Sequence, residues 1–496
     1  MLRCLRPFVF PTPRLSTSCC AANVRHAASV HSSVSRVSEV SGTVDVDEIP
    51  TLSFLSSKTV LTQTVDRTIE VCDALLNEIP KAKTAREKHD LIDSTSNVLC
   101  LLLDPCEFVR QVHPDAEYKQ HASYAFQKGY EYMSKVNSRR DLYDVVLQLD
   151  SPEGHKELSG EEIKNVAQLR RDMESNGIHL PDKLREKVTE MNIEKEELAM
   201  RFLTEQGSKN PFATLRYLLR CRYDLAQLLG FESYAEQQLR GTMLKNQQRV
   251  WHFLCGIAHK YRAEAEREMN IIRSNVGEVR NRHNVTDDVR ARVAHSLRRD
   301  AEPERVAEYF SVANCIRGIQ CLCLEVFGVR LEEVPFEKEE IFNRDAKKYH
   351  VYDEDKAFLG VIVLDLYASD MKYCQAGHLT LQLGCIPHQE ALAKVGLKLP
   401  KRQYPVVVLT CNVGALSPAQ RLPNGKFDDE STLMHPNEVT TVFHEFGHAM
   451  HTIFGQTKVQ NLAGTRASID YVETFSQLFR AISHFTRVSS ALGTPN

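Results

Sequence analysis

The sequence contains no long hydrophobic run and no surplus of positive charge. Its longest apolar stretches, such as residues 98–103, fall well short of the roughly 18 apolar residues that a membrane-spanning helix needs. Lys and Arg number 62 against 65 Asp and Glu, which gives a net charge of −3, whereas nucleic-acid-binding domains usually carry a basic surplus. We therefore expect no membrane span and no nucleic-acid partner.

Paired cysteines are also missing. The 14 cysteines are scattered over 496 residues without a CxxC pair, and the closest are Cys19 with Cys20 and Cys321 with Cys323. Disulfide scaffolds belong to small secreted chains, so we expect mostly reduced thiols. A chain of this length is too long for one small core and indicates two or three subdomains.

Acidic residues are absent from the first 38 positions. That segment contains five arginines and frequent serines, and the first acidic residue is Glu39. Arginine and proline interrupt its apolar runs, which excludes the hydrophobic region of a secretory signal. We expect residues 1–45 to be a mitochondrial transit peptide, which implies delivery to the mitochondrial matrix; the alternative is a disordered tail with a chance bias.

Helical periodicity dominates from about residue 55. Apolar residues recur at three- and four-residue steps along residues 61–79 and 163–173, and Pro181 is predicted to open a further helix. A long helix is expected after Gly241. Its apolar stripe, which we expect to pack into the core, consists of Trp251, Leu254, Ala258, Tyr261 and Ala265.

The pattern changes to short strand-like segments near residue 357. Residues 358–367, 378–383 and 404–411 are rich in Val, Ile, Leu and Thr, and turn-like segments separate them. They predict a small sheet inside an otherwise helical protein, immediately before the most informative motif.

Residues 444–448 read His-Glu-Phe-Gly-His, which is the HExxH pattern. Two histidines four positions apart project from one face of a helix, so His444 and His448 can reach one metal ion. Glu445 lies near the same face and can take a proton from an activated water and pass it to the leaving amine. Zn²⁺ suits imidazole ligands and keeps an open position for chemistry.

The surrounding residues predict a buried amphipathic helix for this motif. Asn437 is a good N-cap, and Gly455 is a good helix stop. The apolar face consists of Val439, Val442, Phe443, Phe446, Met450 and Ile453.

A catalytic zinc site needs a third protein ligand. A histidine ten residues after His444 would define another class of zinc peptidase, but that position is Phe454. His451 lies one turn beyond the motif and is more simply a neighbour of the site than a ligand. Glu473 is the better candidate, because a second helix capped by Ser468 and packed against the first would direct its carboxylate at the ion.

Asp470 lies one turn before Glu473 and has two equal interpretations. Its carboxylate could accept a hydrogen bond from a zinc-bound imidazole and orient it. It could equally place negative charge at a helix N-terminus. The buried side of this second helix is predicted to consist of Val472, Phe475, Phe479 and Ile482.

These residues resemble the thimet oligopeptidase family of zinc peptidases. The resemblance rests on HEFGHAMH at 444–451 and DYVETFSQ at 470–477, whose glutamate follows the second histidine of the motif by 25 residues. Residues 364–367 with Lys372-Tyr373 resemble the family's strand-and-loop segment. The likeness covers most of the chain after residue 55 and is specific from about 357 onward. Residues 405–409 and 450–466 are most similar to the branch that processes imported mitochondrial precursors.

The resemblance implies a mainly α-helical, two-lobed metallopeptidase. A deep channel would separate the lobes, with one Zn²⁺ on its floor and a small β-sheet beside the HExxH helix. We expect a helical lobe over residues 46–240 and a zinc catalytic region over 241–496. The implied partner is an extended peptide, which could add to the sheet as a strand. In the mitochondrial branch the substrate loses an N-terminal octapeptide, and the oligomeric state stays open.

Two other functions stay open. A general oligopeptidase that degrades short peptides would carry the same motif, although the arginine-rich leader favours precursor processing. An inactive zinc- or peptide-binding remnant is the other, because the chain ends at Asn496, 23 residues after Glu473, while the family's catalytic domain continues. That further stretch carries residues resembling oxyanion donors, whose loss typically costs about 10²- to 10³-fold in rate. His484 is not expected to replace them, and Arg466 is either a substrate-carboxylate anchor or a surface residue.

Overall fold

The computed structural model describes most of the chain after residue 51. The described residues are 52–204, 211–275, 309–369, 372, 376–414 and 419–483. The predicted leader, Tyr373 and His484 lie outside them. Among the described residues, no helix combines the length and the hydropathy of a membrane span.

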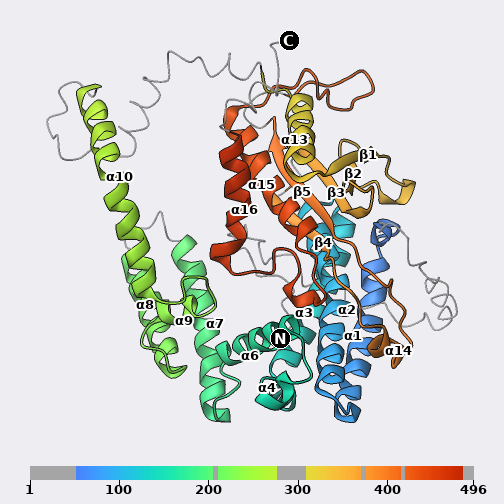
Figure 1. Ribbon diagram of the computed structural model, residues 1–496, viewed down its shortest axis with the longest axis vertical. Coiled ribbons are helices and arrows are strands. Elements are labelled where there is room, and N and C mark those ends of the chain that lie inside the picture. Colours follow the sequence, from blue (N-terminus) through green and yellow to red (C-terminus); the bar gives the residue numbers. More distant parts are fainter. Residues whose placement is uncertain are drawn as a thin grey trace, which may run out of the picture.

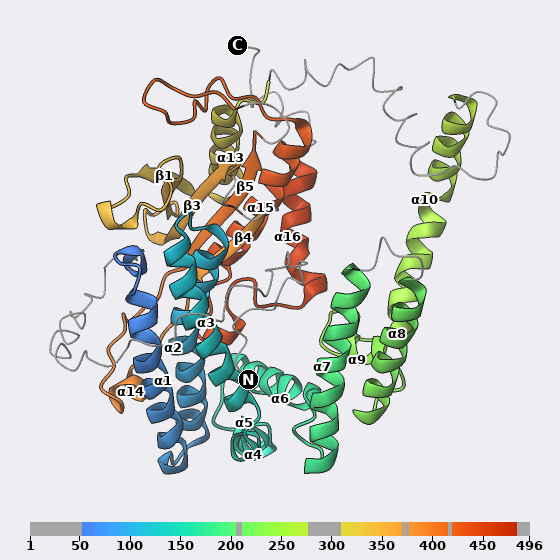
Figure 2. The same cartoon turned by 180° about the vertical axis from the view of Figure 1, so that it is seen from behind.

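Six helices form the N-terminal part of the body. They are α1 (Val60–Glu78), α2 (Ala85–Val112), α3 (Ala116–Asn137), α4 (Arg140–Leu149), α5 (Pro152–His155) and α6 (Gly160–Ser175), with short 3₁₀ turns at Ser53–Leu55 and Ile79–Lys81. Helices α1, α2 and α3 lie side by side in both views (Figure 1, Figure 2). Leu75 of α1, Leu99 of α2 and Leu169 of α6 belong to one apolar core. The stripes predicted over 61–79 and 163–173 are therefore confirmed as helices α1 and α6.

Helices α7 to α10 form an arm that stands apart from the body (Figure 1, Figure 2). They are α7 (Asp182–Thr204), α8 (Pro211–Leu228), α9 (Tyr234–Leu239) and α10 (Gln247–Asn275). Pro181 immediately precedes α7, as predicted. Val188 of α7 packs against Leu225 of α8 and against Leu229, the residue that follows α8, which makes these two helices one small unit.

The stripe on α10 is not buried among the described residues, so the expectation of a core-packing face was wrong. Trp251 is 65% exposed, Leu254 47% and Tyr261 53%. Helical periodicity was correct, but an apolar stripe indicates only that a face needs cover and does not identify what covers it. Every residue from 251 to 268 is exposed, and in Figure 1 the helix α10 stands away from the sheet.

Among the described residues, the sheet has five strands in the order β1-β2-β3-β5-β4. They are β1 (Arg330–Val334), β2 (Lys347–Tyr352), β3 (Phe358–Tyr367), β4 (Gly377–Gln382) and β5 (Val406–Val413). β3 and β5 pair in parallel, and the other neighbours are antiparallel. The three predicted strands are confirmed within two residues at each end. β1 and β2 were not predicted from the sequence, because charged residues interrupt the alternation of apolar and polar residues along them. These residues are Glu332, Glu333, Lys347 and Lys348.

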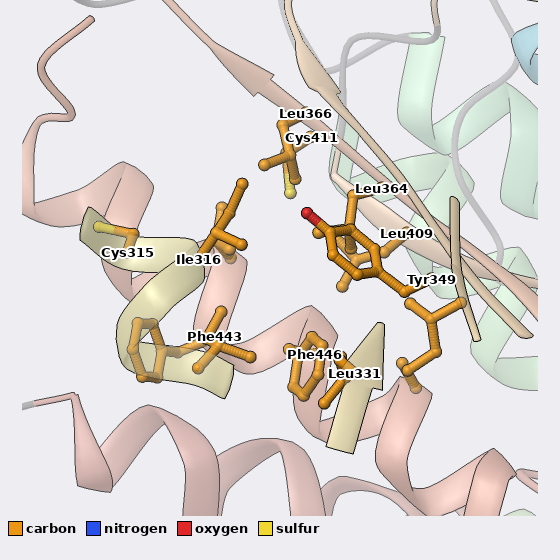
Figure 3. Packing of buried hydrophobic residues seen from close by; sticks show 14 of the residues in the cluster. Cys315, Ile316, Leu331, Tyr349, Leu364, Leu366, Leu409, Cys411, Phe443 and Phe446 are labelled. Atoms are coloured by element: carbon orange, nitrogen blue, oxygen red, sulfur yellow. The ribbon is translucent and has the colours of Figure 1, made fainter. Parts of the chain in front are cut away.

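Alternate residues of the two central strands face two different layers of helices. Val363 and Val408 face the core shared with α1, α2 and α3, whereas Leu364 and Leu409 face the core shared with α13 and α15. Figure 3 shows the second core, with the strand residues turned toward Phe443. Because both faces are covered, β3 reads as a continuous apolar run.

The remaining helices of the described residues include the one that carries the motif. They are α13 (Val312–Phe327), α14 (Gln389–Ala393), α15 (Pro436–Phe454) and α16 (Ile469–Ile482), with 3₁₀ turns at Lys338–Glu340 and Gln460–Leu462. The HExxH residues lie on α15, which packs on the sheet, and α16 packs on α15 (Figure 1).

Gly447 lies where α15 and α16 meet most closely. A Cβ atom at this position would be 2.6 Å from the carbonyl oxygen of Phe475 and 2.7 Å from the Cα of Ser476. Both are backbone atoms, so no side chain can rotate away to make room. The glycine inside the motif therefore sets the distance between the two helices.

We predict that Gly447→Ala forces α16 away from α15 and destabilises the chain by about 1–3 kcal/mol, the usual cost of overpacking. Gly256→Ala is the matched control, because a Cβ atom at this helical position meets nothing within 4 Å. It should be neutral, or stabilising by roughly 0.5–1 kcal/mol. Urea unfolding followed by circular dichroism measures both. Equal effects of the two substitutions would contradict the close approach at Gly447.

Candidate metal centre

A proline and a short polar network start helix α15. Pro436 is its first residue, where the missing N–H costs nothing. His435 is the N-cap: its Nδ1 accepts from the backbone N–H of Asn437, and its own N–H donates to Glu438 at 2.8 Å. Asn437 is therefore not the N-cap, because the start of the helix lies one residue before it. Gly455 follows the last helical residue, as predicted.

The predicted apolar face of α15 is fully buried: Val439, Val442, Phe443, Phe446, Met450 and Ile453. This face fixes the rotation of the helix, because it packs on the sheet. The side chains of His444 and His448, on another face, remain 21% and 7% exposed. The motif histidines are thus turned toward α16.

Glu473 meets the two histidines from α16. Its Oε2 lies 3.5 Å from Nε2 of His444 and 3.4 Å from Nε2 of His448. The three residues form one of two His and carboxylate clusters among the described residues in which the ligand atoms lie within 4.8 Å of one another. Glu473, which follows His448 by 25 positions in the sequence, is thus brought to the two histidines.

Ser476 holds the Glu473 carboxylate in place, and the sequence reading missed it. Its hydroxyl Oγ lies 2.6 Å from Oε2, the oxygen that faces the histidines, and Ser476 is fully buried. It lies three positions after Glu473 and so one turn further along the same helix face. That spacing was visible in the sequence, but nothing there distinguished this serine from the many others.

Asp470 does not orient an imidazole. Its carboxylate accepts from the backbone N–H groups of Met243, at 2.8 Å, and Leu244, at 3.2 Å. These two residues precede α10. The carboxylate therefore joins the start of α16 to the arm, and the other predicted role, charge at a helix N-terminus, agrees with its position.

Two further histidines lie beside the cluster. The ring of His451 packs against Phe475, with centroids 4.4 Å apart, and it is not among the three converging residues. His378 of β4 shares a hydrogen bond of 3.1 Å with Thr452, and its ring centroid is 6.0 Å from that of His448. Nothing in the sequence around His378 predicted that it would lie beside the HExxH helix.

Burial sets the protonation of the site. It lowers the pKa of His448 to about 4 and also lowers the pKa of His444, so both imidazoles are neutral near pH 7 and can donate a lone pair. Burial, assisted by the negative charge of Glu473, raises the pKa of Glu445 to about 7. A carboxyl group with such a pKa exchanges protons readily at neutral pH.

The donor set fits a zinc ion. Two neutral imidazole nitrogens and one carboxylate oxygen are the ligands of one well-known type of catalytic zinc site. Glu473 is 36% exposed, which leaves one side of the cluster open to solvent. The arrangement could therefore hold an ion with an open position, next to Glu445.

A model of the family described as Peptidase family M3 matches residues 183–492. The matched range covers more than half of the chain and includes all of α15 and α16. The chain belongs to peptidase family M3. The mainly helical fold with its small sheet agrees with this assignment.

Curated relatives in this family are mitochondrial intermediate peptidases. The one from Candida glabrata is 25% identical over 86% of this chain and 66% of its own length. That of Vanderwaltozyma polyspora is 26% identical over 81% of this chain and 62% of its own length. That of Saccharomyces cerevisiae is 24% identical over 81% of this chain and 63% of its own length. The chain spans less than two thirds of the length of these relatives.

Two features of the family-like segments are structural. Lys372 and Asp365 form a buried ion pair of 2.9 Å, and Lys372 also donates to the carbonyl oxygen of Tyr367. Arg466 is neither a surface residue nor free for a substrate carboxylate, because it is mostly buried and paired with Asp104 at 3.1 Å. This pair joins α2 to the segment between α15 and α16.

Loss of a residue that only orients a metal ligand typically lowers metal affinity by roughly 10- to 100-fold. We predict that Glu473→Gln lowers zinc affinity by more than this, because it removes a charged ligand. Asp470→Asn is the control on the same helix, and it should leave zinc affinity nearly unchanged. Competition with a fluorescent zinc chelator measures both, after circular dichroism has shown that the variants are folded. Equal losses in the two variants would contradict the assignment of the cluster.

The raised pKa of Glu445 predicts pH-dependent stability in the metal-free chain. The pKa of Glu445 is about 7 in the folded chain and 4.5 ordinarily, so the folded chain binds this proton more tightly than the unfolded chain does. The resulting contribution to the free energy of unfolding is fully present below pH 4.5 and is lost as the pH rises through 7. Glu445→Gln mimics the protonated form and should stabilise the metal-free chain by about 1–2 kcal/mol more at pH 8 than at pH 4. Thermal unfolding with a chelator present gives this difference, and a constant difference across the pH range would exclude the raised pKa.

Proposed function

We propose that this M3 peptidase is a zinc metalloendopeptidase that processes peptides as the mitochondrial intermediate peptidases do. His444, His448 and Glu473 hold one Zn²⁺, and Glu445 is the general base. The observation that supports this most strongly is the convergence of two imidazole nitrogens on one carboxylate oxygen, at 3.4 and 3.5 Å. Neutral histidines and a half-buried glutamate beside them are what peptide hydrolysis needs.

The residues divide the chemistry among them. A bound Zn²⁺ supplies Lewis acidity, which polarises the scissile carbonyl group and lowers the pKa of water. Glu445 takes a proton from the attacking water through its carboxylate and gives it to the leaving amine nitrogen. Ser476 keeps the Glu473 carboxylate fixed, so that the ligand geometry needs no rearrangement during the reaction.

An extended peptide is the substrate that the surroundings of the cluster favour. β4 is at the end of the sheet order and pairs only with β5 among the described strands. Its residue His378 contacts Thr452 of the HExxH helix, so the free edge of the strand lies beside the metal cluster. A peptide could pair with this edge through its backbone and pass the reacting residues.

The substrate, the product and the location are proposed from the similarity to mitochondrial intermediate peptidases. We propose that the substrates are imported precursors, that the product loses an N-terminal octapeptide, and that the chain works in the mitochondrial matrix. We also propose that residues 46–240 and 241–496 act as two lobes. A general oligopeptidase and an inactive remnant are the alternatives that the experiment must separate.

The first test incubates a presequence-type peptide with the purified chain and zinc, and follows products by mass spectrometry. We expect loss of an N-terminal octapeptide that a chelator prevents. Glu445→Gln should slow cleavage by about 10²- to 10⁴-fold, the range for general base catalysis, and retain zinc. Glu430→Gln is the control, since this exposed residue pairs with Arg317 on the surface.

The outcomes separate the three functions. Cleavage at many positions of short unrelated peptides would indicate a general oligopeptidase. An intact peptide with zinc bound would indicate a remnant. Unchanged cleavage by Glu445→Gln would contradict the proposed general base.

A further inference from the structure

A second group of metal-ligating side chains lies outside the HExxH site. It is formed by His89 and Asp90 of α2 together with His388, which precedes α14. The short helix α14 contributes Ala391 and Leu392 to the core of α1 and α2. A segment that follows strand β4 is thus docked on the helical part of the body, and the cluster lies in this contact.

Both histidines direct the same kind of atom at one carboxylate oxygen. Nδ1 of His89 and Nδ1 of His388 each lie 3.2 Å from Oδ1 of Asp90. His89 is completely buried, and the side chains of His388 and Asp90 are 16% and 23% exposed. The three ligand atoms lie within 4.8 Å of one another, as in the HExxH cluster.

The spacing is that of ligands around one small ion. Bonds of about 2.0–2.2 Å in tetrahedral directions place the ligand atoms roughly 3.3 Å apart. The nitrogen-to-oxygen distances here are 3.2 Å, and those of the HExxH cluster are 3.4 and 3.5 Å. Each cluster has two imidazoles and one carboxylate.

The other nitrogen of each ring is occupied by a polar partner. Nε2 of His388 lies 3.0 Å from Oδ2 of Asp93, which also accepts from the backbone N–H of Gln460. Nε2 of His89 lies 3.0 Å from the buried amide of Asn165. Metal-binding histidines nearly always have such a partner, which fixes the ring and leaves the first nitrogen free for the ion.

The amide of Asn165 can serve this purpose. Its oxygen and nitrogen are interchangeable in shape, and Asn165 is hydrogen-bonded to the amide of Asn461 at 2.9 Å. Turning both amides over preserves their mutual hydrogen bond and lets the Asn165 oxygen accept from Nε2 of His89. Nδ1 of His89 then carries a lone pair.

We propose that His89, Asp90 and His388 form a second metal site, for one divalent ion of the zinc class, distinct from the HExxH site. The ion joins α2 to the segment between β4 and β5. These segments are far apart in the sequence: His388 and Asp93, which lies beside the proposed ligands on α2, are 295 positions apart. The partial exposure of His388 and Asp90 gives water access to the fourth position. The proposal does not depend on the function proposed for the HExxH site.

A proton is the competing occupant. A protonated His388 could donate to Asp90 and Asp93 at once, and these two carboxylates raise the pKa of His388. The charged and titratable groups facing the cluster are His89, Asp90, Asp93, His388 and Glu162. The experiment must therefore measure the ion itself.

The test uses the whole 496-residue chain carrying His444→Ala and His448→Ala, so that the HExxH site cannot load. After incubation with zinc and dialysis, metal content is measured by mass spectrometry of the element. We expect about one equivalent of zinc, held with the affinity of a folded site. Adding His388→Ala or Asp90→Asn should reduce it at least about fivefold, because either change removes a ligand.

His155→Ala is the matched control in the same background. His155 also lies 3.2 Å from an aspartate, Asp150, but has no third ligand, so its replacement should leave the metal content unchanged. Asp90→Asn keeps the size of the side chain, and circular dichroism confirms folding. A folded background variant without zinc, or with zinc that neither substitution removes, would overturn the proposal and leave a protonated His388 as the occupant. The difference in metal content between the unmodified chain and the background variant reports on the HExxH site separately.

Discussion

The candidate metal centre depends on the close approach of α16 to α15 at Gly447. Because no side chain stands between the two backbones at this point, Phe475 and Ser476 lie directly against the motif helix. That contact places Glu473, two residues earlier, within reach of both histidines. The connection between the helices, residues 455–468, begins with a loop that is closed by the hydrogen bond from the N–H of Gly464 to the carbonyl oxygen of Gly455, at 2.7 Å.

The sheet fixes the other side of the motif helix. β3 and β5 are buried on both faces, so α15 packs on a rigid support that α1, α2 and α3 back from behind. The buried pair of Lys372 and Asp365 ties the end of β3 to the loop that follows it. Removing one partner of such a pair would leave an uncompensated buried charge, which typically costs about 3–5 kcal/mol. The position of the histidines thus results from layers that extend through most of the body.

Much of this arrangement could be predicted from the sequence. His444 and His448 have a spacing that only a helix converts into a common direction, and apolar residues define the buried face of that helix. Glu473 was predicted from the need for a third ligand and from the pattern of α16. The central strands could be predicted from the sequence because a strand that is buried on both faces has apolar residues at nearly every position.

The rest depends on tertiary contacts that no local pattern encodes. Ser476 and Asp470 are both polar residues on α16, and only the structure shows that the serine holds Glu473 while the aspartate binds the arm. The cluster of His89, Asp90 and His388 joins distant segments whose residues, taken singly, look ordinary. The exposed stripe of α10 shows the same limit, since periodicity locates a face without its partner.

The most direct measurement is X-ray diffraction from crystals of the zinc-loaded chain at energies above and below the zinc absorption edge. The account predicts an anomalous peak about 2.0–2.2 Å from Nε2 of His444, Nε2 of His448 and Oε2 of Glu473. Well-ordered α15 and α16 without a peak between them, or with a peak that Glu473 does not contact, would contradict it.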